Sequence, residues 1–245
     1  MKYIDVYDLG KVSYHPAWDL QKELQNGLIT QKRLIRDGLL DEYKHNDMLL
    51  LVEHPHVYTL GKSGNSSHLL KAIEELAQID AEYIEIDRGG DITYHGPGQI
   101  VGYPILDLDR HFTDIHKYLR FLEEVIIRTC ADYGIEAGRI DGLTGVWVGQ
   151  QKICAMGIRC SRWVTMHGFA FNVNTDLTYF DHIVPCGISD KTVTSLSDLT
   201  GELIDPEYVK ECLMKHFSDV FNIAINPKVQ KPEPEQQFSY LKSLK

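Results

Sequence analysis

Residues 88–104 of the 245-residue chain read RGGDITYHGPGQIVGYP. Two glycine-rich turns, at 89–90 and 96–98, enclose a short stretch in which Thr, Tyr and His occupy positions 93–95. Glycine has no Cβ atom, so the backbone at these turns can come close to a ligand or to another strand. The stretch therefore predicts either a tight hairpin or the wall of a binding site, and its residues alone leave both readings open.

Apolar segments on both sides of this stretch indicate the fold class. Strands dominate the middle of the chain, helical spacing recurs before, within and after them, and Thr113 is expected to cap the middle helix. We expect strands at 3–7, 48–52, 83–86, 100–106, 145–149, 152–160 and 168–173, and helices at 16–37, 113–133 and 208–220. This order predicts an α/β (α+β) fold with a mixed β-sheet flanked by helices.

The length and the tail composition predict the domain organisation. A chain of this length can form one large domain with its own core. We expect a single domain over residues 1–225, followed by a polar tail over 226–245. The tail contains prolines at 227, 232 and 234, and we expect it to be partly disordered.

Charge and hydropathy exclude several classes of function. The formal net charge of −10 argues against a nucleic-acid-binding protein and against adhesion to anionic membranes, because both require a basic face. Residues 1–10 contain no apolar signal-peptide core, and no apolar run is long enough to cross a bilayer. We therefore expect a cytoplasmic protein.

The cysteines are expected to be reduced, because their number is odd and no Cys-x-x-Cys pair occurs. They are Cys130, Cys154, Cys160, Cys186 and Cys212. Cys186 differs from the others in lying between a proline and a glycine, which stiffen one side of it and open the backbone on the other. By itself this tripeptide is compatible with a turn that has no chemical role.

A reactive thiol requires a cationic or basic neighbour that lowers its pKa. The sequence offers four candidates, Lys152, His167, His182 and Lys191. Lys152 begins an apolar strand, where its amine could extend to solvent or be partly desolvated and act as a base. Composition does not choose between these readings.

Two further patterns resemble known sites but lack essential residues. Gly61-Lys62-Ser63 resembles the end of a phosphate-binding P-loop, yet His56 stands where the first glycine is required. His54 and His56 could form a metal-binding pair, but no second pair with metal-ligand spacing is present. We therefore expect no metal and no other cofactor.

Four motifs together resemble one family. They are the segment 88–104, the strand 152–159 (KICAMGIR), the segment 167–173 (HGFAFNV) and the loop 185–187 (PCG). In order and in spacing they are similar to the motifs of the bacterial lipoyl(octanoyl) transferases. The similarity extends from about residue 49 to residue 199, and four motifs in register are highly specific.

The resemblance implies the fold shared by biotin and lipoate protein ligases, and the chemistry of an octanoyltransferase. The donor would be octanoyl-acyl carrier protein. The acceptors would be lysines of apo-lipoyl domains, in 2-oxoacid dehydrogenase E2 subunits and in the glycine cleavage H protein. Carried over by position, Cys186 would be the acyl-thioester nucleophile and Lys152 its base. The acyl pocket would be lined by Arg88, Gly89, Gly90, Asp91, Ile92, Thr93, Tyr94, His95, Ala155, Met156, Gly157, Gly168, Phe169 and Ala170.

Other functions remain open at this level. An ATP-dependent lipoate-protein ligase would share the fold and a lysine but would not need the cysteine. A catalytically inactive module could bind lipoyl domains or acyl carriers without reacting. A papain-like hydrolase is disfavoured, because its cysteine would lie near the mature N-terminus with its histidine far downstream.

The charge of the partners leads to one more expectation. Acyl carriers are acidic, and like net charges slow the encounter of two proteins. We therefore expect a local basic docking patch that uses Arg139, Arg159, Arg162 and Lys191.

Overall fold

The computed structural model describes residues 2–184, 192–226 and 234–243, which form two sheets and their covering helices. The strands are β1 (Tyr3–Lys11), β2 (Asp47–Glu53), β3 (Val57–Leu60), β4 (Glu82–Glu85), β5 (Ile92–His95), β6 (Gln99–Ile105), β7 (Val146–Val148), β8 (Gln151–Ser161), β9 (Val164–Asn172), β10 (Thr192–Val193) and β11 (Ala224–Ile225). The helices are α1 (Tyr14–Arg36), α2 (Ile73–Leu76), α3 (Ile115–Asp132), α4 (Leu196–Thr200), α5 (Pro206–Phe221) and α6 (Pro234–Ser243), with short 3₁₀ turns at Ser66–His68, Ala77–Ile79, Leu108–Arg110 and Leu177–His182.

The large sheet has eight strands and mixed direction. Its order is β10-β8-β9-β6-β2-β1-β11, with β7 paired to β8. β1 and β2 are parallel, whereas β2, β6, β9 and β8 follow one another antiparallel. The small sheet has the order β4-β3-β5. These sheets confirm the expected mixed α/β (α+β) architecture.

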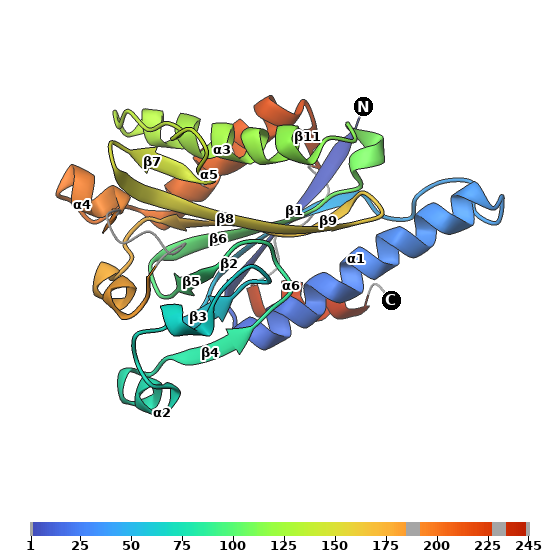
Figure 1. Cartoon of the computed structure of the whole chain (residues 1–245). Helices are drawn as coiled ribbons and strands as arrows, with labels where there is room; N and C mark the ends of the chain where they lie inside the picture. Colours follow the sequence, from blue (N-terminus) through green and yellow to red (C-terminus); the bar gives the residue numbers. More distant parts are fainter. Residues whose placement is uncertain (1, 185–191, 227–233, 244–245) are drawn as a thin grey trace.

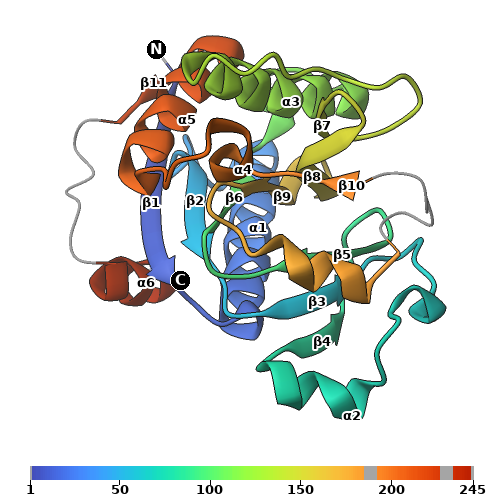
Figure 2. The same cartoon turned by 90° about the vertical axis from the view of Figure 1, so that its left-hand side faces the viewer.

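Helices cover both faces of the large sheet (Figures 1 and 2). α3 and α5 lie on one face, and α1 lies on the other with α6. The central position of β2, between two layers of helices, explains why this strand is apolar throughout. Leu49 and Leu51 pack in the core under α3 and α5, while Leu50 and Val52 pack in the core under α1. A strand buried on both faces reads as a continuous apolar run, which is the pattern in the sequence.

The segment 88–104 does not form a hairpin, although the sequence allowed one. β5 pairs with β3 in the small sheet, whereas β6 pairs with β2 and β9 in the large sheet. The turn between β5 and β6 requires glycine at Gly98, which has φ +77° and where a Cβ atom would lie 2.4 Å from the carbonyl oxygen of Asn174. The segment therefore carries the chain from one sheet to the other.

Two boundaries differ from the expectations. The cap of α3 is Asp114, whose carboxylate accepts a hydrogen bond from Lys117 N at 2.9 Å, so the assignment to Thr113 was wrong by one residue. Within the tail expected to be partly disordered, residues 234–243 form α6. Leu241 of this helix is 2% exposed and joins the core between α1 and the large sheet. None of the helices in the described part of the chain has the length and apolar character that a bilayer crossing requires.

The packing of α6 leads to a stability prediction. Leu241→Ala should lower the free energy of unfolding by about 2–5 kcal/mol, because it removes a buried side chain and leaves a cavity. Ser239→Ala, at an exposed position of the same helix, is the control and should change it by less than about 0.5 kcal/mol. Chemical denaturation measures both, and equal stability of the two variants would contradict the docking of α6.

Candidate active site

A cavity of about 500 Å³ lies where the segment 88–95 approaches β8 and β9. Its lining includes Lys152 and most residues that the resemblance assigns to substrate. These are Arg88, Gly89, Gly90, Asp91, Ile92, Thr93, His95, Ala155, Met156, Gly157, Gly168, Phe169 and Ala170. Cys186 lies outside the described residues.

Tyr94 is the assigned residue that the cavity lining does not include. Its side chain is fully buried and packs in a separate core with Tyr58 and Phe180. Its hydroxyl shares a 2.7 Å hydrogen bond with His56 Nδ1. The Tyr94 side chain therefore stabilises the small sheet by packing in this core, and it does not line the cavity.

Several lining residues were not assigned to substrate from the sequence. They include Tyr14, Gln99, Tyr103, Trp147, His167 and Asn172. Gln99 and Tyr103 belong to the segment 88–104, and His167 begins another of the four motifs, so these motifs could have identified them. Tyr14 comes from α1 and Trp147 from β7, and neither lies in a recognisable pattern.

Arg88 is a buried cation at the point where the two sheets meet. Its Nη2 donates to the carbonyl oxygen and hydroxyl of Thr59 at 2.7 and 3.0 Å, and its Nη1 donates to Gly89 O at 3.1 Å. Gly89 N in turn donates to Ile158 O of β8 at 2.9 Å. A Cβ atom at Gly157 would lie 2.7 Å from Gly89 O and 3.0 Å from Arg88 Cδ. The contact therefore requires glycine at position 157.

Lys152 lines the cavity beside Trp147. Its Nζ is 4.7 Å from the centroid of the Trp147 indole ring, a cation–π distance. β10 begins directly after the undescribed residues 185–191, and its Val193 pairs with Lys152. Thr194 N then donates to Lys152 O at 3.0 Å. The chain that follows the cysteine loop is therefore attached to the lysine strand.

The chain that precedes the cysteine loop is attached to His68 and Leu69. Val184 N donates to His68 O at 2.8 Å, and Leu69 bridges to Ile183. The His68 side chain contacts Asp91 through Nδ1 and Oδ2 at 2.6 Å. The Asp91 carboxylate also accepts a hydrogen bond from the backbone N–H of Ile92. This side chain therefore connects the cavity rim to the segment that leads to Cys186.

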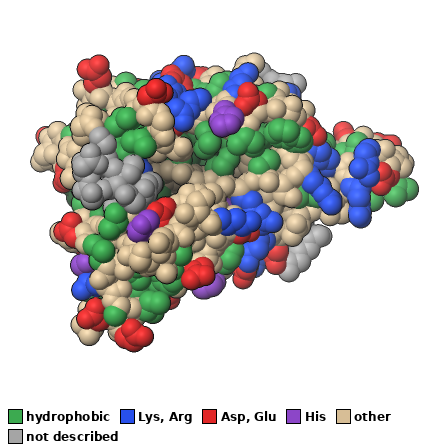
Figure 3. Space-filling model, in the orientation of Figure 1, with side chains coloured by type: hydrophobic (Ala, Val, Ile, Leu, Met, Phe, Trp, Pro, Cys, Tyr) green, Lys and Arg blue, Asp and Glu red, His purple; other side chains and the backbone are tan. Residues whose placement is uncertain are grey.

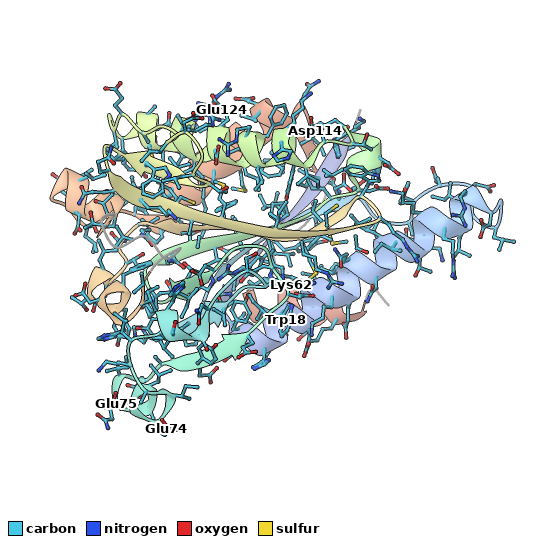
Figure 4. All side chains as sticks on the ribbon, in the orientation of Figure 1. Trp18, Lys62, Glu74, Glu75, Asp114 and Glu124 are labelled. Atoms are coloured by element: carbon cyan, nitrogen blue, oxygen red, sulfur yellow. The ribbon has the colours of Figure 1, made fainter. Side chains whose placement is uncertain are left out.

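Asp87 joins α1 to the cavity wall. Its carboxylate accepts hydrogen bonds from Trp18 Nε1 at 3.1 Å and from His167 Nε2 at 3.0 Å, and it pairs with Arg159. The hydrogen bond from His167, with smaller contributions from Arg159 and Trp18, lowers the pKa of Asp87 to about 2. Burial lowers the pKa of His167, so this imidazole is neutral at pH 7 and donates from Nε2. Figure 4 labels Trp18 on α1.

Two of the four residues of the expected basic docking patch are paired with acidic side chains. Arg139 pairs with Glu123 and Glu124, and Arg159 pairs with Asp87. Lys191 lies outside the described residues. On the face drawn in Figure 3, basic side chains lie in separate groups with acidic side chains beside them. These pairs leave little net positive charge at those two arginines.

The two other patterns have structural roles. In the loop 61–64, Lys62 N donates to Arg88 O at 2.9 Å, and a Cβ atom at Gly61 would lie 2.3 Å from Gly90 O. The loop therefore packs against the Arg88 segment. His54 bonds to Val12 O and to the Tyr103 hydroxyl. Over residues 2–184, 192–226 and 234–243, no group of three metal-ligating side chains is close enough to hold an ion.

Comparison with known proteins places this geometry in a family. The family model described as the lipoyl protein ligase A/B catalytic domain matches residues 13–218. The chain belongs to the lipoyl protein ligase A/B catalytic domain family. It is 55% identical over 231 residues to a protein of Cytophaga hutchinsonii named octanoyltransferase, covering 91% of this chain and 95% of that one. It is also 55% identical over 230 residues to the octanoyltransferase of Flavobacterium johnsoniae, covering 91% and 99%.

Solved structures of lipoate ligases share the fold of this chain. Lipoate-protein ligase A bound with ATP superposes with a TM-score of 0.69 at 15% identity, covering 100% of this chain and 96% of that chain. A bipartite lipoate protein ligase from Thermoplasma acidophilum gives a TM-score of 0.66 at 16% identity, covering 100% and 93%. Because the sequence identities are only 15% and 16%, these two comparisons show that the fold is shared and nothing more.

The contacts of Asp87 predict how stability depends on pH. A folded-state pKa of about 2, below the usual value of about 3.9, means that the stabilisation is fully present above pH 4 and is lost as the pH falls towards 2. Asp87→Asn should lower the free energy of unfolding at pH 7 by about 1–3 kcal/mol.

Thermal unfolding between pH 7 and pH 2.5 checks this expectation. The melting temperature of Asp87→Asn should fall less with acid than that of the wild type. Asp219→Asn, at an exposed position of α5, should follow the wild type. An unchanged acid dependence in Asp87→Asn would show that Asp87 does not contribute in this way.

Proposed function

We propose that the protein is an octanoyltransferase that moves an octanoyl group from octanoyl-acyl carrier protein to the lysine of an apo-lipoyl domain, through a thioester on Cys186. The observation that carries the proposal is the arrangement around the cavity. Lys152 lines it, and the two described segments that flank the cysteine loop attach to Lys152 and, through His68, to Asp91, which also lines it. The names of the relatives agree with this reaction.

The first half-reaction transfers the acyl group between thiols. Lys152 takes the proton of the Cys186 thiol, and the thiolate attacks the carbonyl carbon of the octanoyl thioester. The C–S bond to the carrier then breaks, and the carrier thiolate leaves with the proton that Lys152 returns. Backbone N–H groups of the glycine-rich segments would stabilise the oxyanion. One thioester replaces another, so no energy source is needed.

The second half-reaction transfers the group to nitrogen. The acceptor lysine attacks as the neutral amine, and Lys152 removes its proton. The thiolate of Cys186 leaves as the amide forms. Conversion of a thioester to an amide is downhill, so the reaction requires neither ATP nor a metal.

The proposed acceptors are lipoyl domains, in 2-oxoacid dehydrogenase E2 subunits and in the glycine cleavage H protein. The proposed compartment is the cytoplasm, because the nucleophile must stay reduced. The four described cysteines are free, in agreement with a reducing compartment.

The runner-up is an ATP-dependent lipoate ligase, because one structure with the same fold is a ligase bound with ATP. Such an enzyme would keep its activity without Cys186 and would require ATP. Activity of Cys186→Ser that depends on ATP would therefore favour it over the transferase.

Intact-protein mass spectrometry tests the nucleophile. After mixing with octanoyl-acyl carrier protein, the wild type should gain one octanoyl group, and Cys186→Ala should gain none. Cys160→Ala is the matched control, because Cys160 is a partly exposed thiol whose pKa is raised by burial, and this variant should be acylated normally. An adduct that survives in Cys186→Ala would refute the assignment.

Steady-state kinetics test the base. Lys152→Met should lower kcat by about 10²–10⁴-fold with little change in the KM for the carrier, because it removes proton transfer and not binding. Lys215→Met, at an exposed position of α5, should keep wild-type kinetics. A variant of Lys152 that raises KM and leaves kcat unchanged would assign this residue to binding instead.

A further inference from the structure

Glu123 is a buried carboxylate on α3 to which the proposed reaction gives no role. Its side chain is fully buried, and its neighbours on the helix, Leu122, Val125 and Ile126, belong to the apolar core. A charge in such surroundings costs free energy unless close partners compensate it. The partners of Glu123 therefore indicate what it does.

The carboxylate holds both ends of one loop, residues 139–145. Oε2 accepts a hydrogen bond from Arg139 Nε at 2.9 Å, at the start of the loop. Oε1 accepts one from Gly145 N at 3.0 Å, at its end. Arg120, on α3, pairs with Oε1 at 3.0 Å and adds a second positive charge.

The loop 139–145 forms the cavity wall beside Lys152. Three of its residues, 142–144, line the cavity. Gly145 has φ +118°, and a Cβ atom there would lie 3.5 Å from Lys152 Cε, so the lysine stem runs directly past it. Trp147, whose ring lies under Lys152 Nζ, exchanges two backbone hydrogen bonds of 2.7 and 2.9 Å with Gly138. The loop and the indole therefore form one surface around the amine.

From these contacts we infer that Glu123 is a positioning residue for Lys152, acting through Gly145 and the loop 139–145. The inference rests on the catalytic role proposed for Lys152. Displacement of the loop would move the surface against which the lysine stem lies. A shift of about 1 Å in a reacting group can cost about 10²-fold in rate.

Glu124 provides a matched comparison on the same helix. It also accepts a hydrogen bond from Arg139, through Nη2 at 3.0 Å, but its other partner is Arg128 at 3.0 Å on the outer side of α3. Figure 4 shows Glu124 at the upper surface, away from the sheet. It shares the arginine with Glu123 but lies away from the cavity wall.

The test measures single-turnover acylation of Cys186 by octanoyl-acyl carrier protein. Glu123→Gln should slow the acylation rate at saturating carrier by about tenfold or more, with the KM for the carrier unchanged. Glu124→Gln should stay within about twofold of the wild type. Arg139→Gln alters the other end of the loop at a partly exposed position and should also slow acylation, which keeps the test valid if Glu123→Gln unfolds.

A double-variant cycle separates positioning from general damage. In a Lys152→Met background, Glu123→Gln should cause no further loss of rate. Glu123 acts by positioning the Lys152 amine, and that amine is absent from this background. An equal loss in both backgrounds, or normal acylation by Glu123→Gln and Arg139→Gln, would overturn the inference. If the wild type itself forms no Cys186 adduct, the proposed function fails instead, and the two failures are distinguishable.

Discussion

A hydrogen bond of 2.9 Å from Gly89 N to Ile158 O joins the small sheet to the large sheet, and it can form only because residue 157 has no side chain. A Cβ atom at residue 157 would lie 2.7 Å from Gly89 O and 3.0 Å from Arg88 Cδ, and the Arg88 guanidinium reaches across to Thr59 of β3. The cavity is the space left between the two sheets once this contact is made. A side chain at position 157 would push Gly89 and Arg88 away from β8 and so change this wall of the cavity.

Charged groups around this contact are held by fixed partners. Asp87 binds groups from α1, β8 and β9, Asp91 binds His68, and Glu123 binds the loop beside Lys152. These partners fix side chains that surround the cavity, and charges held in fixed positions stabilise a transition state well.

The sequence predicts those parts of the fold that depend on local pattern. The continuous apolar run at 48–52 marks a strand buried on both faces, and the helix expected at 208–220 lies within α5. Pairing across long sequence distances was not predictable, so the small sheet formed by residues 57–60, 82–85 and 92–95 was missed. The sequence contains no signal that β5 and β6 belong to different sheets.

The site shows the same division. Three motifs in register, 88–104, 152–159 and 167–173, contain the predicted residues that line the cavity. Tyr94 was assigned with its neighbours, although its side chain packs into the core behind β5. Glu123 and Arg139 were not connected to the site, because sixteen positions separate them in the sequence and their contact depends on how the loop returns to α3.

A crystal structure of the protein after reaction with octanoyl-acyl carrier protein tests the central claim most directly. We expect the acyl carbonyl to be bonded to Cys186 Sγ near Lys152, with the hydrocarbon chain in the cavity between Gly157 and Gly168. An acyl chain outside this cavity, or one bonded to another residue, would contradict the claim that the junction of the two sheets forms the acyl site.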